Sequence, residues 1–166
     1  MKKNLFLLFV GALLMVACAT PEERAARQAE NLKMVKAAVG SQQYRINVSS
    51  MTPMRGTSTN VMGRWVKIDS NNVDCYLPYV GRDDAPHMKT RGEIKSDAKL
   101  EFKTEMENYN LQYQPSKKCG VITFKASDMG DDYNFKIIVD NTGRARITVT
   151  PRDRDYINYE GSVYGL

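Results

Sequence analysis

Residues 122–149, ITFKASDMGDDYNFKIIVDNTGRARITV, alternate apolar and polar side chains in three successive runs. A period of two is typical of β-strands that bury one face. The residues between the runs, 128–132 and 140–143, are rich in Asp, Asn and Gly, which favour tight hairpin turns. This stretch therefore predicts three consecutive antiparallel strands.

The same alternation extends in both directions from this stretch, from residue 42 to the end of the chain. It marks apolar faces at Tyr44, Ile46 and Val48; Ala98, Leu100 and Phe102; Tyr109, Leu111 and Tyr113; and Ile157, Tyr159 and Val163. We expect a mainly β fold, an antiparallel meander of about nine to ten strands. A curled, barrel-like sheet is favoured over a two-layer sandwich. Residues 51–56 predict a turn or bulge, and residues 81–87 a long polar loop in which ligand contacts could lie.

One helix is expected before the strands. Thr20 suits an N-cap, Pro21 the first helical position and Glu23 the capping box, while Gly40 suits the end. One side of this helix carries an apolar stripe: Ala25, Ala29, Leu32, Val35 and Val39. We expect the stripe to pack across the β domain; the alternative is a spacer or a partner-binding helix held near a membrane.

The N-terminus carries an export signal. Residues 5–17 are apolar but too short to span a bilayer, which takes about 20 residues. Met15-Val16-Ala17-Cys18 resembles a lipobox, which predicts that Cys18 is lipidated and becomes the mature N-terminus. An ordinary signal peptide and an uncleaved helical anchor are the alternatives.

Three segments are therefore expected: a signal peptide (residues 1–17), the lipid-attached Cys18 with the helix (residues 18–40) and one antiparallel β domain (residues 41–166). Acyl chains, palmitate among them, would hold the protein on a membrane, at about 0.8 kcal/mol per buried methylene. We expect a cell-envelope protein, anchored in the outer membrane and facing the periplasm.

Charge and cysteine content limit the binding partners and the disulfides that we expect. After removal of residues 1–17 the chain has 22 basic and 19 acidic residues, without a basic cluster, so nucleic acid is not an expected partner. An oxidising compartment permits a disulfide between Cys75 and Cys119. Alternation places Cys75 inward and Cys119 outward or at a strand start, which argues against that pair.

No catalytic or metal-binding constellation is evident. His87 is the single histidine, and a surface role in its polar loop is favoured over catalysis. Carboxylates at Asp83, Asp84, Asp128, Asp131 and Asp132 could in principle hold Ca²⁺ or hydrolyse glycosides, but Asp-rich turns are common. We therefore expect no metal, no cofactor and no enzymatic activity.

Several short motifs occur in order along the chain, including residues 44–48, 54–58, 76–82, 133–137 and 157–161. With these motifs the sequence resembles domain of unknown function 4251, a family of Bacteroidetes lipoproteins. The resemblance covers roughly residues 30 to 164. It implies the fold, lipidation and an envelope location, and it implies no activity.

Tyr76, Tyr79 and Arg82 are the candidate ligand-binding residues. Two tyrosines around Pro78, followed by an arginine, could stack on a sugar or bind a carboxylate. The structural alternative, which we favour, is a strand at a sheet edge whose tyrosines cover the end of the core. The leading functional hypothesis is a non-enzymatic interaction module that binds an envelope protein or a polymer such as a glycan. The alternative is a binder of a small molecule, lipid or glycan inside the curled sheet.

Overall fold

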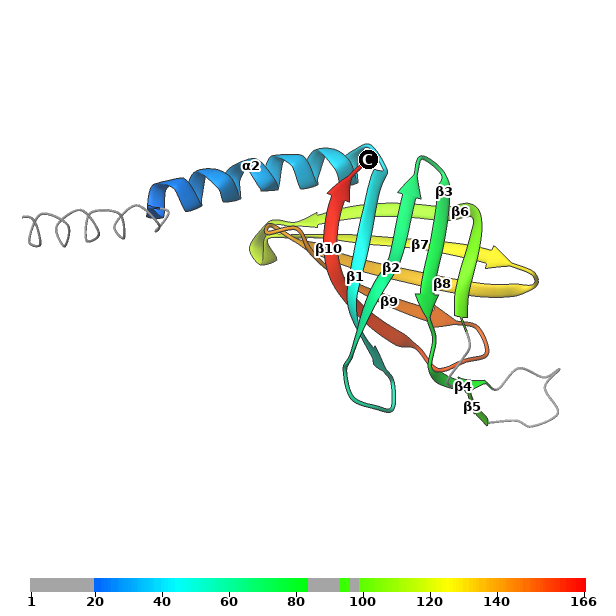
Figure 1. The fold of residues 1–166 in the computed structure, drawn as a ribbon. Coiled ribbons are helices and arrows are strands. Elements are labelled where there is room, and N and C mark those ends of the chain that lie inside the picture. The colour runs from blue at the N-terminus through cyan, green and yellow to red at the C-terminus, as the bar shows by residue number, and fades with distance from the viewer. Residues whose placement is uncertain (1–19, 84–92, 96–98) are drawn as a thin grey trace, which may run out of the picture.

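A computed structural model describes residues 20–83, 93–95 and 99–166. Its elements are α2 (Pro21–Gly40), β1 (Gln43–Pro53), β2 (Thr59–Asp69), β3 (Asn72–Pro78), β4 (Gly81–Asp83), β5 (Glu93–Lys95), β6 (Lys99–Gln114), the 3-10 turn η1 (Pro115–Lys117), β7 (Cys119–Asp128), β8 (Asp131–Asp140), β9 (Arg144–Pro151) and β10 (Ile157–Gly165). Eight strands form a closed antiparallel barrel in the order β1-β10-β9-β8-β7-β6-β3-β2, and β4 and β5 form a separate hairpin (Figure 1). The predicted mainly β, barrel-like fold with one N-terminal helix is confirmed. Cys18 and His87 lie outside the described residues.

Short turns set the strand pairing, among them the turn predicted within residues 128–132. Asp69 pairs with Asn72 and Asp128 with Asp131, so each connection between them is a two-residue hairpin loop. In the second loop Met129 has φ 47° and Gly130 has φ 90°. Two left-handed residues are what a hairpin turn matching the right-handed strand twist requires. Two of the barrel pairings join strands that are not consecutive. β3 pairs with β6 across the β4–β5 segment, and β1 closes the barrel by pairing with β10 from the opposite end of the domain.

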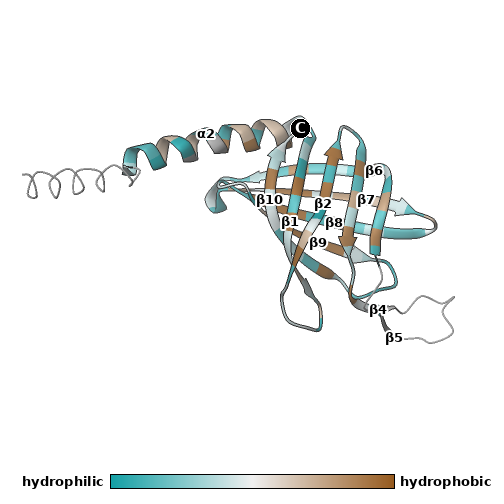
Figure 2. Ribbon diagram, viewed as in Figure 1, coloured by the Kyte–Doolittle hydropathy of each residue, from teal (hydrophilic) through white to brown (hydrophobic). Residues whose placement is uncertain are grey.

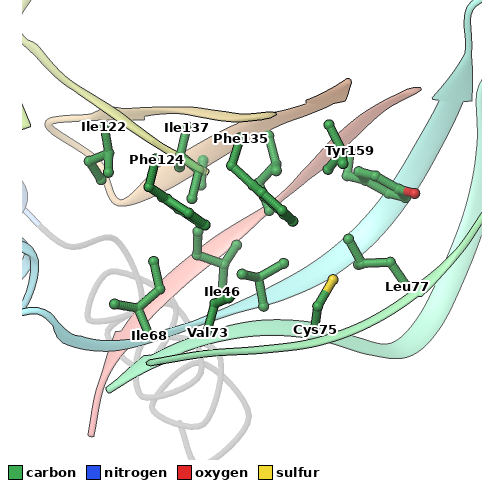
Figure 3. Close-up of a cluster of buried hydrophobic side chains, with 14 of the residues drawn as sticks. Ile46, Ile68, Val73, Cys75, Leu77, Ile122, Phe124, Phe135, Ile137 and Tyr159 are labelled. Atoms are coloured by element: carbon green, nitrogen blue, oxygen red, sulfur yellow. The ribbon is translucent and has the colours of Figure 1, made fainter. Parts of the chain in front are cut away.

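The barrel interior is filled with apolar side chains from every wall strand. Figure 2 shows hydrophobic and hydrophilic residues along the wall strands, and Figure 3 shows part of the buried cluster. The faces predicted in residues 122–149 all point inward, and Ile122, Phe135 and Ile147 are 2% exposed or less. At the centre, the rings of Phe124 and Phe135 stack with centroids 4.7 Å apart. Because these side chains are buried and closely packed, the core is the main source of the stability of the fold.

β6 is one long strand with a change of phase in its middle. Its inward residues are even-numbered up to Met106, whereas Tyr109 packs against the core from an odd position. The shift occurs at a β-bulge between Glu107 and Asn110, where Asn108 has φ 56°. The alternating segments around residues 98–102 and 109–113 are therefore parts of one strand. Leu111, in the second segment, lies outside the packed interior.

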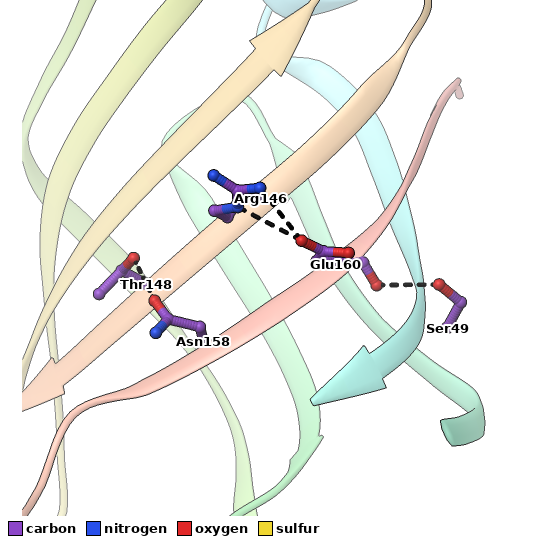
Figure 4. A network of polar contacts seen from close by, with 5 residues as sticks. All are labelled: Ser49, Arg146, Thr148, Asn158 and Glu160. Carbon is purple, nitrogen blue, oxygen red and sulfur yellow. Dashed lines mark hydrogen bonds and ion pairs between the residues drawn. The ribbon is translucent and has the colours of Figure 1, made fainter. Parts of the chain in front are cut away.

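Outward-facing side chains pair across neighbouring strands. Glu160 accepts hydrogen bonds from Arg146 opposite it, and Asn158 Oδ1 accepts one from the Thr148 hydroxyl at 2.7 Å (Figure 4). Such exposed cross-strand pairs contribute roughly 0.2–1 kcal/mol each. They fix the β9–β10 register more than they stabilise the fold.

The helix prediction is confirmed in its ends and only in part in its packing, because Val39 lies in the core and Val35 packs against it, whereas the N-terminal half of the stripe does not. Thr20 and Glu23 form the capping box, with both bonds at 3.2 Å. Of the apolar stripe only Val39 is buried, and Ala25 and Ala29 are exposed. The reason is that closure of the barrel leaves no open sheet face for a helix to cover. Only the last turns of α2 contact β1 and β10, and the rest projects away from the barrel (Figure 1).

The disulfide permitted by the sequence is not formed. Both cysteines are free and buried, so Cys119 lies at a strand start and does not point outward. Cys75 is opposite Phe102 and Cys119 is opposite Gln114, twelve residues further along β6. That span is roughly 40 Å along the strand, whereas a disulfide needs Cα atoms within about 7 Å.

Buried tyrosine and cysteine side chains make the fold sensitive to alkali. Burial, first among the causes, raises the pKa of Tyr44 and Tyr159 well above 10, that of Tyr133 to about 12 and that of Cys75 well above 9. A pKa that is higher in the folded state contributes stability that is fully present below the unfolded pKa. This stability is lost as the pH rises toward the folded pKa.

We therefore expect the free energy of unfolding to decline from about pH 9, where unfolded Cys75 ionises, and more steeply above about pH 10, where unfolded tyrosines ionise. Urea unfolding at a series of pH values measures this directly. Tyr159→Phe serves as the control, because its curve should fall less steeply above pH 10. A free energy of unfolding that stays constant to pH 11.5 would contradict the assignment of these groups.

Candidate functional site

The three candidate ligand-binding residues do not form one site. Tyr79 is 1% exposed, and its hydroxyl donates a hydrogen bond to the carbonyl oxygen of Asp155 at 2.7 Å. It closes the end of the core, as the structural alternative predicted for the tyrosines. The sheet edge that this alternative assumed is wrong, because β3 pairs with both β2 and β6 in the closed barrel. A Cβ on Gly81 would lie 2.4 Å from the Tyr79 hydroxyl oxygen, so glycine at this position permits that close approach.

Arg82 is half-buried beside the same connection. Its amide donates to Asp155 Oδ2 at 3.2 Å, and its carbonyl oxygen accepts from the Asp155 amide at 3.1 Å. These bonds tie β4 to the segment between β9 and β10. The Tyr79 hydroxyl and the Arg82 backbone therefore help to hold the barrel end together.

Tyr76 lies elsewhere, on the outer wall of the barrel. Its ring centroid is 4.6 Å from that of Trp65, its partner in the β2–β3 ladder. Arg45 covers Trp65 with Cζ 4.5 Å from the ring centroid, and Arg64 covers Tyr76 at 4.4 Å. We call these four residues the Arg–aromatic row. Three of them, Arg45, Arg64 and Trp65, were absent from the sequence-based candidates.

An apolar groove runs between α2 and the neighbouring ends of β6–β8, with a volume of about 240 Å³. Its apolar walls are Leu32, Val35, Val39, Leu111, Tyr113 and Val139. Lys36 and Lys118 border it, with Asp140 as the one acidic neighbour, and Lys36 Nζ lies 4.6 Å from the centroid of the Tyr113 ring. We call this the α2 groove.

Apolar side chains also surround the opposite side of α2. A wider, open hollow of about 920 Å³ is lined by α2 and the C-terminal residues, including Met34, Ala38 and Leu166. Met34 is 58% exposed and Leu166 is 59% exposed. The helix is thus flanked on both sides by apolar surface that no described residue covers.

Two residues of the α2 groove were identified in the sequence, but their alternation predicted that they face the core. Leu111 and Tyr113 alternate correctly for inward positions, yet they are 39% and 46% exposed. β6 has 16 residues and β3 has 7, so the end of β6 has no core to enter. The difference in length between β6 and β3 is the feature from which the exposure of Leu111 and Tyr113 could have been predicted.

Two of the carboxylates considered for metal or hydrolytic chemistry are engaged in ion pairs, and Asp84 lies outside the described residues. Asp131 pairs with Arg154 at 2.6 Å, and Asp132 pairs with Arg152. Across residues 20–83, 93–95 and 99–166, no group of three or more His, Cys, Asp or Glu side chains gathers to hold a metal ion. Burial raises the pKa of the Cys75 thiol, so this thiol stays protonated and unreactive.

A family model for a domain of unknown function, DUF4251, matches residues 26–163. The chain belongs to the DUF4251 family. A crystal structure of a DUF4251 family protein from Bacteroides eggerthii DSM 20697 is similar in fold, with a TM-score of 0.66 and 12% identity over 84% of this chain and 91% of that one. No curated protein matches the sequence. The predicted family is therefore confirmed, and it carries no assigned activity.

A search for membrane-crossing helices in the described residues found none of sufficient length and apolarity. Because Cys18 and the preceding segment lie outside those residues, membrane attachment stays a prediction.

Proposed function

We propose that this DUF4251 protein is a non-enzymatic lipoprotein of the cell envelope that binds another envelope protein in the α2 groove. The observation that carries the proposal is the uncovered apolar surface of α2, because a helix projecting from its domain without burying its stripe is stabilised when a partner covers it. The anchor would be a lipid on Cys18, on the outer membrane facing the periplasm.

The spacing of the anchor and the groove supports this arrangement. Cys18 precedes the N-cap Thr20 by two residues, whereas the groove lies at the C-terminal half of α2. Twenty helical residues rise about 30 Å, the full length of α2. A lipid at Cys18 would leave the groove and the barrel clear of the bilayer surface.

The chemistry of the groove indicates what kind of segment it accepts. Leucine, valine and tyrosine walls favour apolar side chains of a helix or strand, a recurrent mode of peptide recognition. Lys36 and Lys118 outnumber Asp140 at its border, which favours acidic residues beside the apolar ones. A binder inside the sheet has less support, since Phe102, Phe124, Phe135 and their neighbours occupy the interior.

The test uses chemical cross-linking in intact cells. The full-length protein is compared with Val35→Glu/Leu111→Glu, which places charges in the groove, and with Met129→Glu, a matched control. Met129 is 100% exposed in the β7–β8 turn, away from α2. We expect a defined complex with a second envelope protein in the wild type and the control, reduced at least tenfold in the groove variant.

Equal complex formation by the groove variant and the wild type would contradict the proposal. A complex that contains only copies of this chain would also contradict it. The anchor is checked in the same cells, because labelled palmitate should enter the wild-type protein and not Cys18→Ala. Equal labelling of both proteins would contradict lipidation at Cys18.

A further inference from the structure

The Arg–aromatic row is a preorganised cationic surface on the wall formed by β1, β2 and β3. Its four side chains contact one another in the order Arg45, Trp65, Tyr76, Arg64, at successive distances of 4.5, 4.6 and 4.4 Å. All four are half-buried, because each covers part of its neighbour. A guanidinium held flat on a ring loses little further freedom when its N–H edge binds a ligand.

The two arginines have no acidic partner among the residues that the structure describes. Two carboxylates near them in the strand register pair with lysines, Asp69 with Lys67 at 3.4 Å and Glu101 with Lys99 at 3.5 Å. A third, Asp74, lies opposite Lys67 in the β2–β3 ladder. Arg45 Nε is buried and makes no hydrogen bond to an acceptor. The contact with the Trp65 ring is therefore the interaction that positions this guanidinium among the described residues.

The geometry points to an anionic glycan as the ligand of the Arg–aromatic row. Guanidinium groups bind carboxylates and phosphates through paired N–H bonds, and two of them on one wall suit a polymer that carries repeated negative charges. Trp65 and Tyr76 lie between the two cations and add half-buried aromatic surface against which a sugar ring can pack.

A membrane surface fits this wall less well than a glycan. Binding to anionic lipids depends on the number of basic residues near the bilayer, and clusters of four to eight are typical. Here two arginines form no ion pair with any described residue, whereas Lys67 and Lys99 nearby are paired with carboxylates. Two fixed cations with aromatic rings between them favour recognition of a defined polymer.

The single tryptophan of the chain, Trp65, lies inside the proposed site and reports on its occupancy. The full-length protein in neutral detergent is titrated with polygalacturonate, a carboxylate polymer, while Trp65 emission is recorded. Dextran, a neutral glycan, and vesicles containing phosphatidylglycerol are the comparison ligands. We expect a saturable change with polygalacturonate and none with dextran.

Three variants separate specific recognition from general attraction. Arg45→Gln/Arg64→Gln should weaken binding at least tenfold. Arg45→Lys/Arg64→Lys keeps the net charge but loses the flat stacking and the paired donors, so it should also weaken binding severalfold or more. Arg144→Gln removes an exposed cation from β9 and should bind as the wild type does.

Several outcomes would overturn the inference: no emission change with polygalacturonate, an equal change with dextran, a stronger response to the vesicles, or a lysine variant as tight as the wild type. Far-UV circular dichroism shows whether each variant is folded. The α2 groove takes no part in this test, so its result is independent of the proposed protein partner.

Discussion

Gly161→Ala is expected to destabilise the protein by about 3 kcal/mol and to lower Tm by roughly 10 °C, because it forces β1 away from β10. A Cβ at Gly161 would lie 2.2 Å from the carbonyl oxygen of Asn47 and 3.0 Å from the Cα of Val48. Both are backbone atoms, so no side chain can rotate away. The clash falls on the seam that closes the barrel, beside the bulge between Val48 and Ser50.

The matched control is Gly120→Ala, also in a strand. The nearest atom to its new Cβ is Leu111 Cδ1 at 3.5 Å, an ordinary contact. Its Tm should stay within about 2 °C of the wild type, since alanine and glycine differ little at an unstrained site. Equal Tm values for Gly161→Ala and wild type would show that β1 and β10 do not approach as closely as described.

Phe135→Ala is expected to cost about 3–5 kcal/mol, the range for removing a fully buried aromatic ring. Phe135 is 2% exposed, stacks on Phe124 at 4.7 Å and meets Phe102 edge-on at 6.3 Å (Figure 3). Its removal leaves a cavity in the middle of the barrel that the surrounding β-strands cannot collapse to fill. Urea unfolding measures the loss as a shift of the midpoint at constant slope.

Leu111→Ala is the control for this prediction. Leu111 is 39% exposed in the α2 groove, so the substitution should cost less than about 1 kcal/mol. A similar loss in both variants would indicate that the barrel interior is not the main source of stability. A change in slope for Phe135→Ala would indicate that the variant no longer unfolds in one step.

The local elements were predictable because they depend on neighbouring residues. Alternation in residues 122–149 and the turns at Asp128 and Asp140 account for β7, β8 and β9. The capping box at Thr20 likewise accounts for the start of α2. In each case the physical cause lies within a few residues of the structure it produces.

Part of the Arg–aromatic row could also have been predicted. The Asp69–Asn72 turn sets the β2–β3 register, and that register places Trp65 opposite Tyr76. Grouping Tyr76 with Tyr79 overlooked the fact that Tyr79 follows β3, beyond the end of that strand. Arg45 lies beside Trp65 because β1 pairs with β2. The β2–β3 register does not determine that pairing, so the position of Arg45 could not be predicted in the same way.

Features that depend on long-range closure were not accessible from the sequence. The β6 bulge at Asn108 changes which residues face inward, and its effect is visible only once β6 and β7 are aligned. Closure of β1 on β10 removes the open face that the α2 stripe was expected to cover. The exposed part of α2, and with it the α2 groove, results from this closure of the barrel.

The most direct measurement of the central claim, that a partner protein occupies the α2 groove, is photo-cross-linking in living cells. A photoreactive amino acid replaces Leu111 in one strain and Met129 in another, and mass spectrometry identifies the cross-linked peptide. The account predicts an adduct at position 111 with a segment of another envelope protein that carries apolar and acidic residues, and none at position 129. No adduct at position 111, or the same adducts at both positions, would contradict it.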